Sequence, residues 1–278
     1  MAKTDNFSIR YRILDAKRGV PQRACRVLAS HHEIAELVVE GFMIRRKLVS
    51  DRTVRALRNA VSEVLRREKT RRSRTKNTCF ESDYLRNLLD KHAAFAALFR
   101  LRATASIARA VLGPQIRFDE ITARITELAR SPASTPWHIH LRVVPEPLPP
   151  FFAYPHGIEC LLYLDDADEA NGALCVLPGS HREVSRIHSS QDVESKPGQK
   201  GLSLSAGDCV IMHTNLWHRV LPSATTQGRR RVVIFGYQPS WISGEERGGS
   251  LRGSRVLKAF RKHRASAIRE LAGEFYWG

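Results

Sequence analysis

The sequence predicts an α+β protein built around an antiparallel sheet. Up to about residue 115, apolar residues recur at helical spacing, whereas the following stretch consists of short runs in which apolar and polar residues alternate. Pro, Gly and Asn separate these runs, and helices do not alternate with strands. Several short strands bounded by turn residues favour a sandwich or a jelly roll.

Helices are expected mainly in the first part of the chain. Ser30 is a suitable N-cap for the first of them, Gly41 a suitable stop, and Gly113-Pro114 ends the last. The expected helices are 30–42, 50–68, 83–99 and 101–112. A basic amphipathic helix is expected at about 255–272, either covering the barrel or, as the alternative, lying on a membrane surface.

Strands are expected from residue 116 onwards. The β-rich runs are 116–128, 157–166, 172–180, 201–213 and 230–239. These elements predict a single domain over 1–278. Its parts are a mainly helical segment at 30–115, a jelly-roll core at 116–240 and a C-terminal loop and helix at 241–278.

Composition restricts the class of protein. Hydrophobic residues make up 42% of the 278, which is enough for a packed core. We see neither an apolar run long enough to span a membrane nor a secretory signal in the first residues. The five cysteines form no CxxC pair, which argues against a disulfide framework or a structural zinc site. A reducing cytoplasm is therefore expected.

The charge balance is strongly basic. Lys and Arg total 45 against 28 Asp and Glu, a net charge of +17. Such a surface attracts anions, so the partner could be nucleic acid, an acidic carrier protein, a phosphorylated substrate or an anionic membrane. Alternatively, the arginines are only solvated surface residues. Because no nucleic-acid motif is present, nucleic acid ranks last.

The stretch "TPWHIH" at 135–140 carries two histidines one residue apart. Alternate residues of a strand point to the same face, so His138 and His140 could enter one site together. His218, far along the chain, is a third candidate. The pattern suggests a metal centre.

Four pieces in order resemble a known family. They are "TPWHIH", "NGALCVLPGSH", "AGDCVIMHTNLWH" and the later "RRR". Together they are similar to the phytanoyl-CoA dioxygenase family of iron- and 2-oxoglutarate-dependent oxygenases. The resemblance extends over roughly residues 30–240, and "NGALCVLPGSH" is its most specific piece.

The resemblance implies a double-stranded β-helix, the cupin-like jelly roll, with iron held by a His-x-Asp pair and a distal His. His138 matches the first ligand and His218 the distal one. Position 140 departs from the family, because His140 stands where the family has Asp. A trio of His138, His140 and His218 could still hold a divalent metal. His213 and His181 match positions that are usually not ligands.

The co-substrate 2-oxoglutarate needs a cation for its distal carboxylate, and a guanidinium pairs with it best. The family places this Arg eleven residues after the distal His, which favours Arg229. Arg231 is the alternative, since strand alternation puts it on the same face. Phe152, Tyr154 and Trp217 are candidate substrate-binding residues near the barrel mouth.

The resemblance implies Fe(II) and 2-oxoglutarate as cofactors and hydroxylation of a C–H bond in a small molecule, tethered to coenzyme A or a carrier protein or free. Two alternatives stand beside it. The first is a metal-binding or degenerate member without turnover, suggested by His140. The second is an oxygenase or binding module directed to nucleic acid, suggested by the charge.

Overall fold

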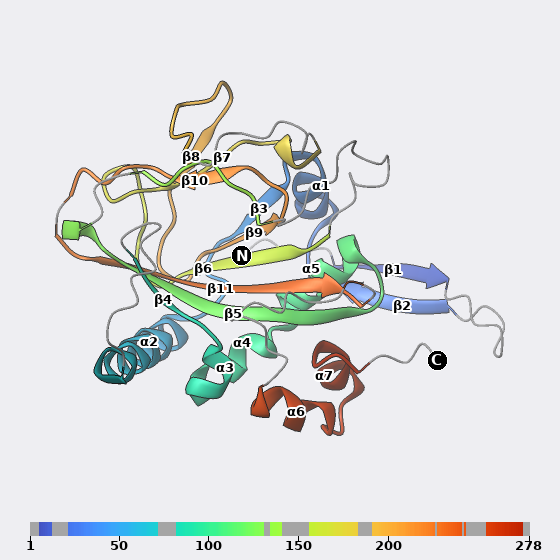
Figure 1. Ribbon diagram of the computed structural model, residues 1–278. Helices are drawn as coiled ribbons and strands as arrows, with labels where there is room; N and C mark the ends of the chain where they lie inside the picture. Colours follow the sequence, from blue (N-terminus) through green and yellow to red (C-terminus); the bar gives the residue numbers. More distant parts are fainter. Residues whose placement is uncertain are drawn as a thin grey trace.

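Two antiparallel sheets pack face to face, and helices cover the outer face of the larger one (Figure 1). The computed structural model describes residues 6–12, 22–71, 82–130, 134–140, 156–182, 191–225, 227–240, 242 and 254–274. The large sheet has the order β3 (Phe42–Arg45), β9 (Cys209–His213), β6 (Ile158–Tyr163), β11 (Arg229–Pro239), β5 (Ile116–Glu127) and β4 (Ser82–Leu85). The small sheet has the order β10 (His218–Val220), β7 (Leu174–Val176) and β8 (Lys200–Leu202). The predicted α+β jelly roll is confirmed.

The long strands β11 and β5 form the middle of the large sheet. They pair antiparallel from Arg229 opposite Glu127 to Pro239 opposite Ile116, with a bulge between Phe235 and Tyr237. Side chains of β11 alternate between two environments. Val233 and Phe235 join the core under the helices, whereas Val232 and Ile234 pack between the two sheets.

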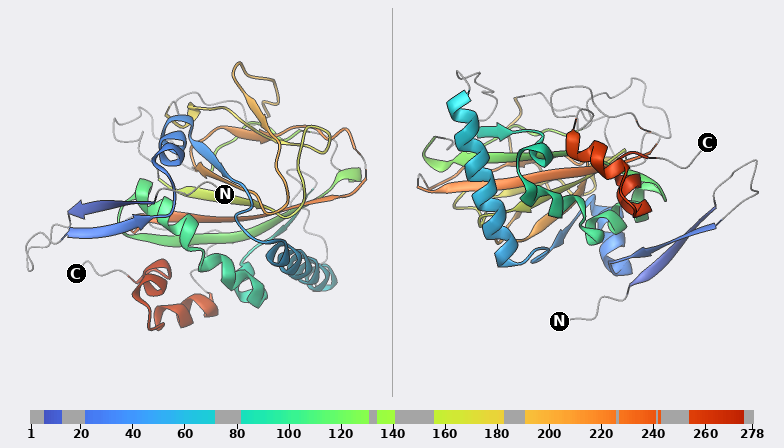
Figure 2. Two further views of the ribbon diagram at one scale, coloured as in Figure 1. Left: turned by 180° about the vertical axis from the view of Figure 1, so that it is seen from behind. Right: turned by 90° about the horizontal axis from the view of Figure 1, so that it is seen from below.

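The helices begin and end largely where the sequence indicates. They are α1 (His31–Glu40), α2 (Asp51–Arg71), α3 (Leu88–Lys91), α4 (Ala96–Phe99), α5 (Arg102–Leu112), α6 (Arg255–Arg261) and α7 (Ser266–Leu271). Ser30 and Glu33 form a capping box at the start of α1, and Gly41 ends it in the left-handed conformation at φ 85°. Figures 1 and 2 show α2, α3, α4, α6 and α7 on the same side of the large sheet.

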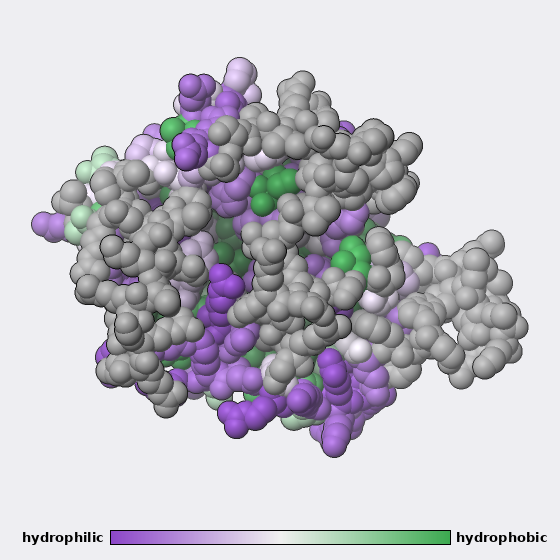
Figure 3. All heavy atoms as spheres, in the orientation of Figure 1, coloured by the Kyte–Doolittle hydropathy of each residue, from purple (hydrophilic) through white to green (hydrophobic). Residues whose placement is uncertain are grey.

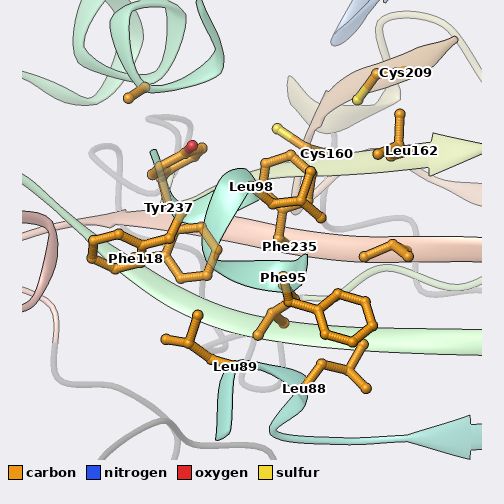
Figure 4. Packing of buried hydrophobic residues seen from close by; sticks show 14 of the residues in the cluster. Leu88, Leu89, Phe95, Leu98, Phe118, Cys160, Leu162, Cys209, Phe235 and Tyr237 are labelled. Atoms are coloured by element: carbon orange, nitrogen blue, oxygen red, sulfur yellow. The ribbon is translucent and has the colours of Figure 1, made fainter. Parts of the chain in front are cut away.

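Aromatic rings fill the core between the large sheet and these helices (Figure 4). Phe118 of β5 stacks on Phe235 of β11 with ring centroids 5.9 Å apart, and meets Tyr237 edge-on at 5.5 Å. Phe99 of α4 joins Phe118 to Phe260 of α6, at 5.0 and 4.7 Å. The predicted C-terminal amphipathic element therefore covers the sheet through buried Leu257, Phe260 and Leu271.

Three elements differ from the sequence prediction. The helix expected over 83–99 is wrong at its start, because Ser82–Leu85 forms edge strand β4 beside β5. The rest of that segment breaks into short helical turns after Asn87, which has a positive φ of 54°. The C-terminal helix is two helices, and an unpredicted hairpin of β1 (Phe7–Arg12) and β2 (Gln22–Val27) projects from the body (Figure 2).

Replacing Phe235 should test the aromatic core. Phe235→Ala removes a fully buried ring and leaves a cavity against Phe118, so the free energy of unfolding should fall by about 3–5 kcal/mol. Tyr237→Phe is the matched control, because it removes only the hydroxyl that bonds Thr104 and should cost about 1 kcal/mol. Urea denaturation measures both. A Phe235→Ala loss below that of the control would contradict this description of the core.

Candidate metal centre

Backbone pairing brings His138 and His218 together. The two residues form an antiparallel bridge in which each amide N–H donates to the other's carbonyl, at 3.0 and 3.1 Å. The amide of His140 donates to the carbonyl of Thr214 at 2.8 Å, which brings the third imidazole in. The ligand atoms of the three histidines all lie within 4.8 Å of one another. The described residues thus contain the trio that the sequence predicted.

Residues between and beside the histidines face the other way. Trp137 is buried in a cluster with Cys175 and Trp217, and its Nε1 donates to the carbonyl of Glu194 at 2.7 Å. The guanidinium of Arg219 lies 5.1 Å above the Trp137 ring. Alternation along 137–140 therefore sends the tryptophan into the protein and both histidines toward one site, and the shared direction of the two histidines is what the sequence predicted.

Hydrogen bonds at Nδ1 orient each ring. The Nδ1 of His138 lies 2.8 Å from the carbonyl of Pro136, and the Nδ1 of His218 lies 2.9 Å from the carbonyl of Leu216. The Nδ1 of His140 contacts the carboxylate of Glu159. With Nδ1 as the donor in each case, Nε2 is the nitrogen that carries the lone pair for a metal.

The electrostatics of the trio suit a cation. Burial lowers the pKa of His218 well below its ordinary value, and the neighbouring His138 and His140 lower it further. A neutral imidazole is the form that binds metal. Three neutral nitrogen ligands in one place fit a divalent iron, so the residues present match the group.

The three histidines line one pocket. Its polar lining includes the guanidinium groups of Arg124 and Arg230 together with Thr126 and Tyr163. Its apolar walls are Leu161, Leu174, Val220, Val232 and Ile234. Two arginines beside the histidine trio give the pocket a chemistry that suits an anionic ligand.

The predicted arginines, Arg229 and Arg231, do not reach the pocket. The side chain of Arg229 is exposed and pairs with Glu127 at 2.6 Å. Arg231 makes a bidentate pair with Asp165 at 2.7 and 2.8 Å. Arg230, on the opposite face of the strand, is the arginine of this run that lines the pocket.

Arg230 is held by the Asn-Gly turn that begins the motif "NGALCVLPGSH". Its Nη1 donates to the carbonyls of Asn171, at 2.6 Å, and Gly172. Burial lowers the pKa of Arg230, and Arg124 acts in the same direction, although a guanidinium remains charged. Gly172 has a φ of +88°, and a Cβ there would overlap Nη1 of Arg230. Glycine is therefore required where the chain passes this guanidinium.

The end of the same motif supports the strand that carries His218. The hydroxyl oxygen of Ser180 accepts a hydrogen bond from the amide of Trp217 at 3.0 Å, and the amide of Leu177 donates to the carbonyl of Trp217 at 2.9 Å. These contacts hold the backbone just before His218. The motif thus serves both the predicted ligand and the pocket arginine.

The expected substrate residues are not brought to the pocket in the part of the chain that is described. Trp217 is buried in the cluster with Trp137, and Phe152 and Tyr154 lie outside the described residues. Sequence reasoning missed Arg124, Arg230 and Glu159. Glu159 did leave a signal, as the one charged residue in the apolar run of β6.

His213 and His181 form a second pair outside the trio. Their ring centroids lie 4.5 Å apart, and Nε2 of His181 lies 3.0 Å from the carbonyl of Val38 in α1. Burial lowers the pKa of His213 to about 3, with nearby His181 and His156 as smaller causes. Burial also lowers the pKa of His181. Their contacts with each other and with α1 join them to the packing of the fold.

The profile of the family described as "Phytanoyl-CoA dioxygenase (PhyH)" matches residues 37–232. The chain belongs to this family. The cofactors of the phytanoyl-CoA dioxygenase family are Fe(II) and 2-oxoglutarate, as the sequence predicted. A search of curated proteins found no match.

Solved structures share the fold at low sequence identity. HygX from Streptomyces hygroscopicus, with nickel, 2-oxoglutarate and hygromycin B bound, is 16% identical with a TM-score of 0.62, over 77% of this chain and 89% of that one. AviO1 from Streptomyces viridochromogenes Tue57 is 22% identical with a TM-score of 0.58, over 76% and 96%. The α-ketoglutarate-dependent carbocyclase SnoK from nogalamycin biosynthesis is 19% identical with a TM-score of 0.60, over 80% and 89%.

Within the described residues, no helix combines the length and apolarity needed to cross a membrane.

The buried pair of His213 and His181 should make stability depend on pH. Between about pH 6.5 and pH 3 the unfolded chain binds a proton at His213 that the folded protein does not, so the free energy of unfolding falls as pH falls below 6.5. His213 alone should lower it by about 2 kcal/mol between pH 7 and pH 5. Urea denaturation of metal-free protein at both pH values measures this. His213→Gln should reduce the difference, and equal stability of the wild type at both pH values would contradict it.

Proposed function

We propose that the protein is an Fe(II)- and 2-oxoglutarate-dependent hydroxylase, formed by one domain, that acts on a C–H bond of a small molecule. The observation that carries the proposal is the trio of His138, His140 and His218 in a pocket that also holds two guanidinium groups. Histidines for a metal and cations for a dicarboxylate are the two requirements of this cofactor pair.

Each group has a role that follows from its place. The Nε2 atoms of the three histidines would hold the iron, and the carbonyls of Pro136 and Leu216 keep two of the rings oriented. Iron and 2-oxoglutarate, when bound, would supply the chemistry for oxygen-dependent oxidation of an unactivated C–H bond, with 2-oxoglutarate converted to succinate and carbon dioxide. The protein binds and orients the substrates, and its apolar walls exclude water.

Arg230 is proposed as the anchor of the distal carboxylate of 2-oxoglutarate, in place of Arg229 or Arg231. The hydrogen bonds of its side chain to the motif turn run from Nη1, which leaves the Nε–Nη2 edge as the donor fork for a carboxylate. Arg124 lines the same pocket and adds positive potential. A buried cation on a rigid strand is a better anchor than an exposed one already paired with Glu127.

The substrate class is proposed from the neighbours and the surface. HygX binds hygromycin B, and SnoK is a carbocyclase of nogalamycin biosynthesis, so a specialised metabolite fits this fold. The basic surface favours an anionic handle or an acidic carrier protein over nucleic acid, with Phe152 and Tyr154 kept as candidate contacts. A cytoplasmic location remains part of this proposal.

Succinate formation tests the function. Purified protein loaded anaerobically with Fe(II) should convert 2-oxoglutarate to succinate when oxygen is admitted, slowly without substrate and faster with a suitable metabolite. Iron binding without any succinate would support the alternative of a metal-binding member without turnover. Failure to bind iron at all would overturn both.

Arg230→Ala should weaken 2-oxoglutarate binding. A charge-assisted hydrogen bond to a carboxylate is worth roughly 1.5–3 kcal/mol, so the dissociation constant should rise about tenfold or more. Arg229→Ala is the matched control, because it removes a neighbouring, solvent-exposed arginine that does not line the pocket and should leave the constant unchanged. Calorimetry with metal-loaded protein measures both. A loss confined to the Arg229 variant would return the anchor to that residue.

Raising the salt concentration should increase KM for the true substrate and change kcat little. Figure 3 shows hydrophilic residues gathered over α6 and the turn that follows it, where the exposed basic residues are Arg255, Lys258, Arg261, Lys262 and Arg264. Screening weakens long-range attraction between such a face and an anion. Steady-state kinetics at low and physiological ionic strength provide the measurement, and Lys258→Glu combined with Lys262→Glu should reduce the dependence. Insensitivity of KM to salt would exclude an anionic handle.

A further inference from the structure

Strand β6 places a carboxylate beside the metal trio. Its sequence is IECLLY, and all six residues are buried. Glu159 is 5% exposed and is the only charged residue of the strand. Burying a carboxylate is costly unless it is hydrogen-bonded, so a specific partner is expected. That partner is His140, whose Nδ1 contacts Oε2 of Glu159.

The pairing of β6 explains why Glu159 points to the site. Ile158, Cys160 and Leu162 join the core under the helices, whereas Leu161 and Tyr163 pack on the side of the pocket, and Glu159 shares their phase. On β11 the residue opposite Glu159 is Gly236. The side chain of Glu159 therefore passes close to the backbone of β11 at Gly236, where a Cβ would lie 3.7 Å from Cγ of Glu159, an ordinary contact distance.

We propose that Glu159 is a positioning residue that acts on the metal through His140. Its carboxylate accepts the hydrogen of Nδ1, which fixes the tautomer of His140, presents Nε2 to the metal and makes that nitrogen a stronger donor. Three neutral imidazoles bring no negative charge to a divalent ion, and Glu159 supplies one directly behind a ligand. The proposal rests on the metal centre of the proposed function and adds a fourth residue to it.

The geometry distinguishes this role from direct ligation. The group whose ligand atoms lie within 4.8 Å of one another consists of the three histidines and does not include Glu159. Its oxygen lies against Nδ1 of His140, the ring nitrogen assigned to the hydrogen bond rather than to the metal. If Glu159 were itself the ligand, His140→Ala would retain metal binding, whereas the proposed arrangement requires that this variant lose it.

Metal affinity of the full-length protein tests the proposal, measured by calorimetry with Ni(II) and without 2-oxoglutarate. Glu159→Gln keeps the shape of the side chain and removes its charge, and should weaken Ni(II) binding by about tenfold to a hundredfold, the usual effect of losing such a partner. Glu127→Gln is the matched control, because its carboxylate pairs with Arg229 away from the pocket, and it should bind within about twofold of wild type. Thermal unfolding of the metal-free variants verifies that each is folded.

Glu159→Gln in a His140→Asp background separates the positioning role from a merely structural role. A structural role predicts the same effect on Ni(II) affinity in both backgrounds. There the introduced carboxylate and Glu159 would repel each other, and no imidazole remains for Glu159 to orient. Glu159→Gln should then leave Ni(II) affinity unchanged or increase it, opposite to its effect in the wild-type background. An equal loss in both backgrounds would overturn the proposal.

The outcomes separate this proposal from the proposed function. If wild type binds Ni(II) and Glu159→Gln binds it equally well, the positioning role is wrong and the metal centre stands. If wild type itself does not bind Ni(II), the metal centre is wrong. If Glu159→Gln abolishes binding while His140→Ala retains it, Glu159 is a ligand and the role assigned here is wrong.

Discussion

The candidate site depends on two backbone hydrogen bonds between His138 and His218. Segment 134–140 belongs to neither sheet, and these bonds attach it antiparallel to β10. A third hydrogen bond joins the same two segments a few residues away, where the amide of Val220 donates to the hydroxyl oxygen of Thr135 at 2.7 Å. This pairing is what brings the rings of His138 and His218, eighty positions apart in sequence, to one place.

The strand β11 connects the candidate site to the rest of the molecule. One face of it packs Val233 and Phe235 against the helices, and the other contributes Arg230 and Val232 to the pocket. Its neighbour in the sheet, the twelve-residue strand β5, likewise carries Phe118 on the helix side and Arg124 on the pocket side. Stability and ligand binding therefore use opposite faces of the same pair of strands, which lets the pocket accept buried cations without interrupting the core.

The histidine trio could be predicted because it depends on local alternation and on ordered motifs. "TPWHIH" places its two histidines in phase, and the family resemblance identifies His218 over His213. The arginine that lines the pocket could not be chosen this way, because alternation separates Arg230 from Arg229 and Arg231 without indicating which face of the strand is turned to the pocket. The bulky residues Val233 and Phe235 share the phase of Arg229, and only the helices packed against them show that this phase is the outer one.

Contacts between distant segments account for the other differences. Residues 82–85 have no strong strand pattern of their own and become a strand by pairing with the edge of β5. The contact of Glu159 with His140 follows from the position of β6 beside segment 134–140, and nothing in the local sequence indicates it. The family profile supports the cofactors, whereas the surroundings of His140 come from this chain's own contacts, above all with Glu159.

A crystal structure of the protein with Fe(II) and 2-oxoglutarate, prepared without oxygen, tests the central claim most directly. The account predicts one ion bound by Nε2 of His138, His140 and His218, each at about 2.0–2.3 Å, the range of metal–imidazole bonds. An ion held by His138 and His218 with the His140 ring turned away, or with a water or carboxylate in its place, would contradict it.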